Sequence, residues 1–269
     1  MSLSDFAKFA ASLIDAMFDK PTFDIRGELL APPLTKNYGT VGTAFDYAMR
    51  LKLLSFNRKF VKDFPLVARH GAKADRKRKQ FLSAFDQRKD AYLRGEMPIV
   101  SLLPDCIALA KLEAVFRSGR NFPNADIFYA DEEDIRDLRR LVELVEEELF
   151  TATQQCILNP TFGQSSLDVG GADADFIIDG TLVEIKTTKT IEFKREYFRQ
   201  LMGYYILNKR EHDMHGEIEK LGIYFSRFGE LLTFPTPMLH QILVEGDAGK
   251  EKDAWEAVEA SIRAYNEPD

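Results

Sequence analysis

The dipeptide Asp179-Gly180 lies between two short apolar runs and restricts the local fold more than any other feature of this chain. Both residues tolerate the positive φ of a tight primed turn, so Asp-Gly between apolar runs predicts a β-hairpin. A loop of two residues fixes the register, because it places Ile178 opposite Thr181. The stretch Gly171–Lys186, GADADFIIDGTLVEIK, is therefore expected to form two paired strands.

The predicted register sorts the side chains of this hairpin onto two faces, because opposed residues share a face and neighbours alternate. One face is expected to belong to the core and holds Ala174, Phe176, Ile178, Thr181, Val183 and Ile185. The other holds Asp173, Asp175, Glu184 and Lys186, with Ile177 and Leu182 near the turn. Asp175 then faces Glu184, and two opposed carboxylates repel by roughly 0.2–1 kcal/mol. This arrangement favours a cation such as Mg²⁺, which takes oxygen ligands, while Lys186 can hold a water or a phosphate oxygen.

Asp173 is an alternative to Asp175 as a metal ligand. It lies on the same predicted face and would take that role if the turn were longer than two residues. A slip of one residue would move every side chain to the other face of the sheet. The apolar set argues against such a slip, so Asp175 is favoured and Asp173 stays open.

The residues Asp175 and Glu184-Ile185-Lys186 resemble the motif of the PD-(D/E)XK nuclease superfamily. About one helix further on, Gln200-Leu-Met-Gly-Tyr204 is similar to the Q-x-x-x-Y motif of its RecB-like branch. The resemblance covers roughly Gly171 to Phe225. It implies an α/β (α+β) fold with a restriction-endonuclease-like αβββαβ core, a mixed central sheet and a large helical N-terminal elaboration. We expect residues 1–130 to form that elaboration and residues 131–269 the nuclease-like core, together as one compact unit.

The resemblance implies a metal-dependent nuclease that hydrolyses phosphodiester bonds in DNA. Its catalytic residues would be Asp175, Glu184 and Lys186, with Mg²⁺ or Mn²⁺ held by Asp175, Glu184 and the backbone carbonyl of Ile185. Gln200 and Tyr204 would hold the substrate or Lys186. DNA is the implied partner, in a phage, defence or repair context, and the participation of other subunits of a nuclease or defence complex is left open.

Two other interpretations compete with an active nuclease. The first is a catalytically inactive DNA-binding or scaffolding protein of the same fold. The second is a small-molecule enzyme or an interaction protein without a nuclease site, in which Glu184 and Lys186 form only a surface ion pair.

A helix that precedes the sheet could supply one more carboxylate. Tyr38–Asp46 leads into a helix predicted at about Thr43–Phe56, which resembles the first motif of RecB-like nucleases. Asp46 and Arg50 stand where that motif has His and Glu. A second helix is predicted over Asp131–Phe150, where Glu143 or Glu147 could take the same part. For Asp46, Glu143 and Glu147 alike, an exposed acidic helix surface is the favoured interpretation.

The remaining elements are predicted from periodicity and turn residues. We expect helices at 3–18, Thr190–Asn208 and Asp253–Tyr265, and a stretch at Pro98–Phe116 that starts as a loop and becomes a buried helix. Strands are expected at Gln154–Phe162, Leu221–Phe225 and Leu231–Phe234, and a loop at Gly163–Gly170.

Charge is distributed unevenly along the chain. The net charge of −7 does not suggest a nucleic-acid binder, but residues 50–94 hold 14 Lys and Arg against 4 Asp. This segment, which includes Arg76–Lys79, is expected either to follow phosphates or to be only a solvated helix surface.

Composition excludes several classes of protein. With 269 residues, 45% hydrophobic and 29% charged, the chain is typical of soluble globular proteins. No apolar run approaches the ~20 residues of a membrane span, and no signal peptide is recognisable, so we expect a cytoplasmic protein without a membrane partner. Its two cysteines cannot bind an iron–sulfur cluster alone. No P-loop or G-x-G-x-x-G indicates a nucleotide cofactor.

Overall fold

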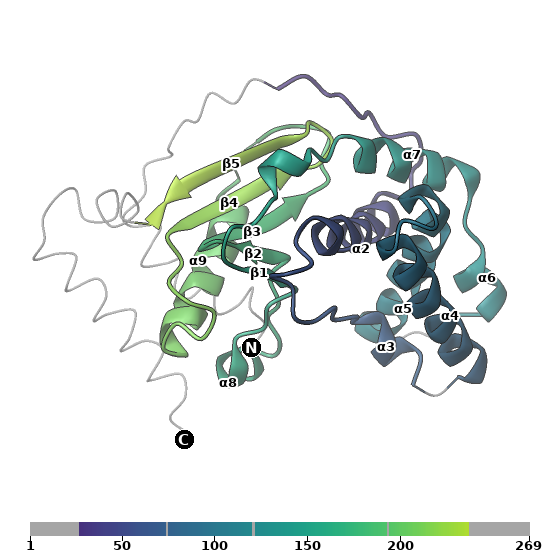
Figure 1. The fold of residues 1–269 in the computed structure, drawn as a ribbon, viewed down its shortest axis with the longest axis horizontal. Coiled ribbons are helices and arrows are strands. Elements are labelled where there is room, and N and C mark those ends of the chain that lie inside the picture. Colours follow the sequence, from purple (N-terminus) through teal and green to yellow (C-terminus); the bar gives the residue numbers. More distant parts are fainter. Residues whose placement is uncertain (1–26, 74, 120–121, 193, 237–269) are drawn as a thin grey trace, which may run out of the picture.

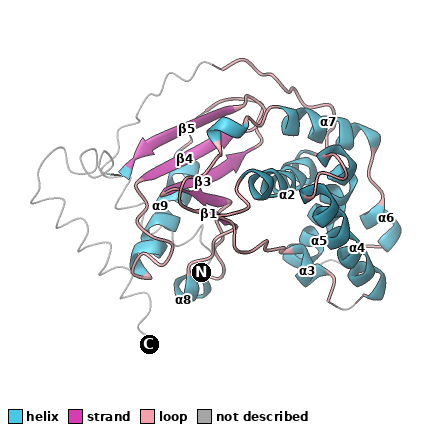
Figure 2. Cartoon of the chain, in the orientation of Figure 1, coloured by secondary structure: helices cyan, strands magenta, loops and turns pink. Residues whose placement is uncertain are grey.

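The computed structural model describes residues 27–73, 75–119, 122–192 and 194–236. Its fold is mixed α/β, with a five-stranded sheet between two layers of helices (Figure 1). The helices on one side, which we call the helical layer, are α2 (Tyr38–Phe56), α3 (Ala68–Gly71), α4 (Arg76–Leu93), α5 (Leu103–Ser118), α6 (Asn124–Phe128) and α7 (Glu132–Glu143). Figure 2 shows this layer beside the magenta strands, with α9 (Arg195–Arg210) behind them. The chain also forms short 3-10 helices at Ile99–Leu102 and Glu147–Leu149.

The sheet has the strand order β1-β2-β3-β4-β5. Its strands are β1 (Cys156–Leu158), β2 (Phe176–Ile178), β3 (Thr181–Lys186), β4 (Lys220–Phe225) and β5 (Glu230–Pro235). The pair β3–β4 is parallel and the other neighbouring pairs are antiparallel. A parallel pair requires a crossover connection, and α9 supplies it on one face of the sheet.

The predicted hairpin register is confirmed. Phe176 pairs with Val183 and Ile178 with Thr181 across a two-residue turn. Asp179 and Gly180 have φ of 43° and 74°, the left-handed values that a primed turn requires. The carboxylate of Asp179 also accepts hydrogen bonds from the backbone N–H of the three residues 153–155, so the turn is attached to the chain that enters β1.

Both faces of the hairpin are buried. Phe176 and Val183 belong to the hydrophobic core shared with the helical layer. Ile177 and Leu182, expected beside the acidic residues, are fully buried in a second core beneath α9. The expectation for Ala174 is wrong: it lies in this second core, because the regular strand begins only at Phe176.

Three predicted boundaries differ because tertiary contacts override local propensity. Helix α2 begins at Tyr38 instead of Thr43, since the buried Val41 and Ala44 extend it through two glycines. Helix α7 ends at Glu143 instead of Phe150, because the Lys52 amino group donates hydrogen bonds to backbone carbonyls at the helix end, at 2.9 and 3.2 Å. The predicted Ser- and Gly-rich loop contains α8 (Gly163–Asp168), which Glu211 holds through the N–H and hydroxyl of Ser165.

The other predicted elements agree in type and differ mainly in their bounds. The strands at β4 and β5 and the helix at α5 are confirmed. Strand β1 has only three residues, and α9 begins at Arg195 instead of Thr190. The helices predicted at 3–18 and 253–265 lie outside the described residues. Among those described, no helix combines the length and apolar character needed to cross a membrane.

A buried ion pair joins the sheet to the helical layer. Arg227, in the β4–β5 turn, is 1% exposed and bonds both carboxylate oxygens of Asp137 on α7, at 2.8 and 3.0 Å. Its guanidinium also donates to the carbonyl of Ala31, ahead of α2. A buried charge that loses its only counter-charge is strongly destabilising, so this contact depends on both partners.

Replacing Asp137 with Ala should lower the free energy of unfolding by about 3–5 kcal/mol, because Arg227 would stay buried without its counter-charge. Urea denaturation followed by circular dichroism measures this change. Arg139→Ala on the same helix is the control, because its ion pair with Glu143 is exposed and such pairs contribute only ~0–1 kcal/mol. An equal decrease in the free energy of unfolding in both variants would show that the buried Arg227–Asp137 pair does not stabilise the packing of the sheet on the helical layer.

Candidate active site

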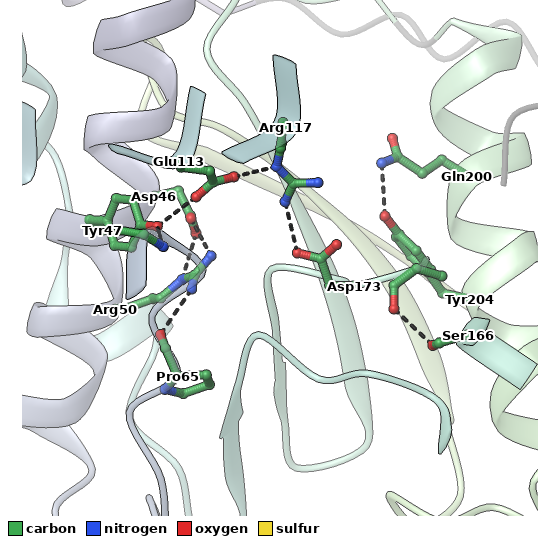
Figure 3. Close-up of polar contacts among 12 residues, drawn as sticks. Asp46, Tyr47, Arg50, Pro65, Glu113, Arg117, Ser166, Asp173, Gln200 and Tyr204 are labelled. Atoms are coloured by element: carbon green, nitrogen blue, oxygen red, sulfur yellow. Dashed lines mark hydrogen bonds and ion pairs between the residues drawn. The ribbon is translucent and has the colours of Figure 1, made fainter. Parts of the chain in front are cut away.

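A polar cavity of about 430 Å³ lies between the helical layer, the β2–β3 hairpin and α9. The charged side chains that line it are five carboxylates and two guanidinium groups, namely Asp46, Glu113, Asp173, Asp175 and Glu184 with Arg50 and Arg117. Figure 3 shows the part of this cavity between α2 and α9. This excess of negative charge is costly without a cation, because burial disfavours the charged forms of Asp46, Asp175 and Glu184.

Asp175 and Glu184 lie on the sheet side of the cavity. The hairpin register, extended by one position, places them opposite each other. Asp175 Oδ2 accepts a hydrogen bond from the backbone N–H of Ile185 at 2.6 Å, whereas the buried Oε2 of Glu184 has no hydrogen-bond partner among the described residues. Burial raises the pKa of Asp175 well above its ordinary value, and the charges of Glu184 and Asp46 raise it further. Burial likewise raises the pKa of Glu184, although Lys186 opposes that shift.

A chain of hydrogen bonds connects Glu184 to α9. The Lys186 amino group donates to Glu184 Oε1 at 2.9 Å and to Gln200 Oε1 at 2.8 Å. It also lies 4.8 Å from the centre of the Tyr197 ring. Gln200 Nε2 in turn donates to the hydroxyl of Tyr204 at 2.9 Å. In this arrangement Gln200 and Tyr204 fix Lys186, and Lys186 orients Glu184.

Asp46 lies in the cavity, so the interpretation of this residue as part of an exposed acidic surface is wrong. It forms an ion pair with Arg50 one turn later on α2, with Arg50 Nε 3.0 Å from Asp46 Oδ1. Arg50 also donates to the carbonyl of Pro65 at 3.2 Å. Burial raises the pKa of Asp46, while Arg50 lowers it. Glu143 and Glu147 are exposed on the helical layer and do not line the cavity.

Sequence analysis missed a second network that enters the cavity from α5. Arg117 Nε donates to Glu113 Oε1 at 2.6 Å, and its terminal nitrogen contacts Asp173 Oδ2 at 3.2 Å. The hydroxyl of Tyr47 donates to the other oxygen of Glu113 at 2.6 Å. Asp173 is therefore engaged by Arg117 in this structure. No local motif joins these residues, which come from α2, α5 and the approach to β2.

The run Arg76–Lys79 of the basic segment does not line the cavity, although Arg50, the first residue of that segment, does. Arg76–Lys79 begins α4, on the side of the helical layer away from the sheet (Figure 1). Arg78 is buried and donates to the carbonyls of Gly71 and Phe122 and to the side chain of Asn124. Arg78 therefore stabilises the packing of α4 and is not available to a phosphate.

Within residues 27–236, apart from the positions left undescribed, no three Asp, Glu, His or Cys side chains are grouped as a metal-binding cluster. Asp175 and Glu184 each have one oxygen engaged, by the Ile185 N–H and by Lys186. Mg²⁺ is often held by only one or two carboxylates together with water and phosphate. The second carboxylate oxygens of Asp175 and Glu184 would therefore be enough protein ligands for one such ion.

Comparison with known proteins adds no relative. No family model, no curated protein and no solved structure matches this chain.

Asp175→Asn should make the metal-free protein more stable, increasingly so as the pH rises above about 4. The folded protein raises the pKa of Asp175, so folding favours its protonated form and stability is lost once the carboxyl ionises. Urea denaturation in EDTA at pH 5 and pH 8 measures the difference between variant and wild type. A variant less stable than wild type at pH 8 would contradict a repulsive site.

Asp179→Asn on the same hairpin is the matched control, with the opposite sign. Burial acts to raise the pKa of Asp179, but the hydrogen bonds from Thr153, Gln154 and Gln155 outweigh it and the pKa is lowered. Its charge therefore stabilises the fold above the unfolded pKa of about 3.9, and this stability is lost at lower pH. The control variant should be less stable than wild type at both pH 5 and pH 8.

Proposed function

We propose that this chain is a metal-dependent nuclease of the PD-(D/E)XK superfamily, RecB-like branch, that hydrolyses phosphodiester bonds in DNA. The observation that carries the proposal is the unpartnered, buried Oε2 of Glu184 beside the half-buried Asp175. A buried carboxylate oxygen without a hydrogen-bond donor is costly, and the surrounding excess of acids favours a divalent cation there.

The order of secondary structure supports the family assignment. From α7 onward the sheet and its covering helices follow the sequence α7, β1, β2, β3, α9, β4, which fits the αβββαβ order with α8 inserted after β1. Glu184 and Lys186 lie on β3, and Asp175 directly precedes β2. Gln200 and Tyr204 lie on the helix that covers this strand. Glu184, Lys186, Gln200 and Tyr204 thus lie on elements of the kind that the resemblance implies, and Asp175 lies next to one.

The residues present fit Mg²⁺ or Mn²⁺. Asp175 and Glu184 supply hard oxygen donors that line the cavity, and Ile185, whose carbonyl would be a further ligand, lines it too. Asp46, on α2 across the cavity, would add a third carboxylate if Arg50 released it. A bound divalent ion would lower the pKa of a coordinated water and offset the charge of the phosphate.

The residues of the chain would orient and neutralise the reacting groups. Lys186 orients Glu184 through its hydrogen bond, and its positive charge would help to offset that of the phosphate from behind this carboxylate. The Gln200 side-chain carbonyl accepts a hydrogen bond from Lys186, and its amide nitrogen donates one to the hydroxyl of Tyr204. Gln200 thus restrains the Lys186 ammonium and is itself held by Tyr204. The side chains of Glu184, Lys186, Gln200 and Tyr204 are already ordered by these contacts in the folded protein. Little entropy would then be lost in ordering them during the reaction.

Wild type should cut labelled single- or double-stranded DNA with Mg²⁺ or Mn²⁺ and not with EDTA. Glu184→Gln and Lys186→Ala should each reduce the rate by about 100-fold or more, the size of effect expected when a charge-stabilising group is lost. Lys220→Ala, a lysine on the neighbouring strand β4 outside the cavity, should leave the rate unchanged.

The alternatives make different predictions in the same experiment. If wild type does not cut and calorimetry detects no Mn²⁺ binding, the nuclease proposal is wrong. DNA binding that is independent of metal would then indicate an inactive DNA-binding protein of the same fold. Absence of DNA binding as well would favour an interaction protein.

A further inference from the structure

Arg117 is the more exposed of the two guanidinium groups that the structure places on the cavity wall. Its side chain is 53% exposed, and it extends from the end of α5 between α2 and the approach to β2 (Figure 3). Arg50 is buried, and its contacts with Asp46 and with the carbonyl of Pro65 hold it in place. Arg117 can therefore reach a ligand in the cavity with less disturbance of the core.

One end of Arg117 is anchored by a buried chain of hydrogen bonds. Its Nε donates to Glu113 at 2.6 Å, and Glu113 also accepts from the Tyr47 hydroxyl at 2.6 Å. That hydroxyl accepts from the backbone N–H of Ala68 at 3.1 Å. These contacts fix the plane of the guanidinium from the helical layer and would remain if its other end changed partner.

The other end of Arg117 makes a weaker contact. Its terminal nitrogen lies 3.2 Å from Asp173 Oδ2, in a partly exposed pair. Exposed ion pairs contribute only ~0–1 kcal/mol, whereas a guanidinium can bind two oxygens of one phosphate. A phosphodiester in the cavity would thus compete well with Asp173 for this group.

We propose that Arg117 binds a backbone phosphate of the nucleic-acid substrate by exchanging Asp173 for it. This inference rests on the proposed nuclease function and names a substrate-binding residue that the motifs do not contain. In the free protein, the Asp173 carboxylate occupies the position that a phosphate oxygen would take. Asp173 and the phosphate therefore compete for the same guanidinium nitrogen of Arg117. Removing Arg117 and removing Asp173 should therefore have opposite effects on substrate binding.

The position of the Arg117–Asp173 ion pair favours a nucleic-acid strand over a single nucleotide as the ligand. A second cavity of about 680 Å³ is lined by Pro65, His70 and Thr161. Two of them contact residues of the first cavity, since Thr161 pairs with Asp173 through the backbone and the Pro65 carbonyl accepts a hydrogen bond from Arg50. His70 stacks on Phe116, which precedes Arg117 in the chain. The Arg117–Asp173 contact therefore lies where the two cavities adjoin, and a strand bound at Arg117 can extend from one into the other.

The test measures binding of a fluorescent single-stranded DNA oligonucleotide in EDTA, together with the KM of its cleavage in Mg²⁺. Arg117→Ala should raise Kd about tenfold and reduce the salt dependence of log Kd by about 0.7, the contribution of one phosphate contact. Arg117→Lys should bind with intermediate affinity, since it keeps the charge without the paired donors. Asp173→Asn should lower Kd several-fold.

The matched control for Arg117 is Arg139→Ala, which removes an arginine of 58% exposure that pairs with a glutamate four residues away, as Arg117 does with Glu113. It should leave Kd and KM unchanged. Thermal unfolding of every variant separates loss of binding from loss of fold, and Arg117→Lys provides a second test if Arg117→Ala is unstable.

A double variant distinguishes exchange from a general effect of charge. In the Arg117→Ala background, Asp173→Asn should give little further gain in affinity, because the competition no longer exists. An equal gain in both backgrounds, or weaker binding in both single variants, would overturn the exchange. If wild type cuts DNA but Arg117→Ala matches Arg139→Ala in Kd and KM, the inference is wrong and the nuclease function stands. If wild type neither binds nor cuts DNA, both are wrong.

Discussion

Burial of opposed carboxylates on one hairpin is the constraint around which the site is arranged. The register that directs Phe176 and Val183 into the core of the helical layer also brings Asp175 and Glu184 to the cavity. Their burial raises both pKa values, so the hairpin stores electrostatic repulsion that the apolar packing on both of its faces must offset. Lys186 compensates only one of the two charges. Such local conflict within a well-packed fold is typical of a functional site.

The helical layer completes the cavity and is held in place by contacts far from it. Asp46 and Arg50 enter from α2, and Glu113 and Arg117 from α5. The buried pair of Arg227 with α7 fixes that layer against the turn that follows β4. Because the two walls belong to different layers, their relative position determines how closely the carboxylates and guanidinium groups approach one another.

The two arginines of the cavity have different physical characters. Arg50 is buried and neutralises Asp46 within the same helix, which keeps one carboxylate of the wall paired. Arg117 is anchored by Glu113 at one end and partly exposed at the other. Its contact with Asp173 is therefore easier to exchange than the buried contact of Arg50 with Asp46. A cavity rich in carboxylates repels a polyanion, and an exchangeable guanidinium beside a divalent cation would offset that repulsion.

Local sequence rules determined the β2–β3 hairpin and the placement of Gln200 and Tyr204 on one face of α9. The Asp-Gly turn and the alternation of apolar residues specified the register, and a spacing of four placed Gln200 and Tyr204 on one face of α9, because turns and periodicities involve only neighbouring residues. The tertiary structure alone decided the rest. It ended α7 with hydrogen bonds from Lys52, 90 residues earlier in the chain, and brought Asp46 and Arg117 to the hairpin. These contacts join segments far apart in sequence and leave no local pattern, since only the packing of the layers determines which side chains meet.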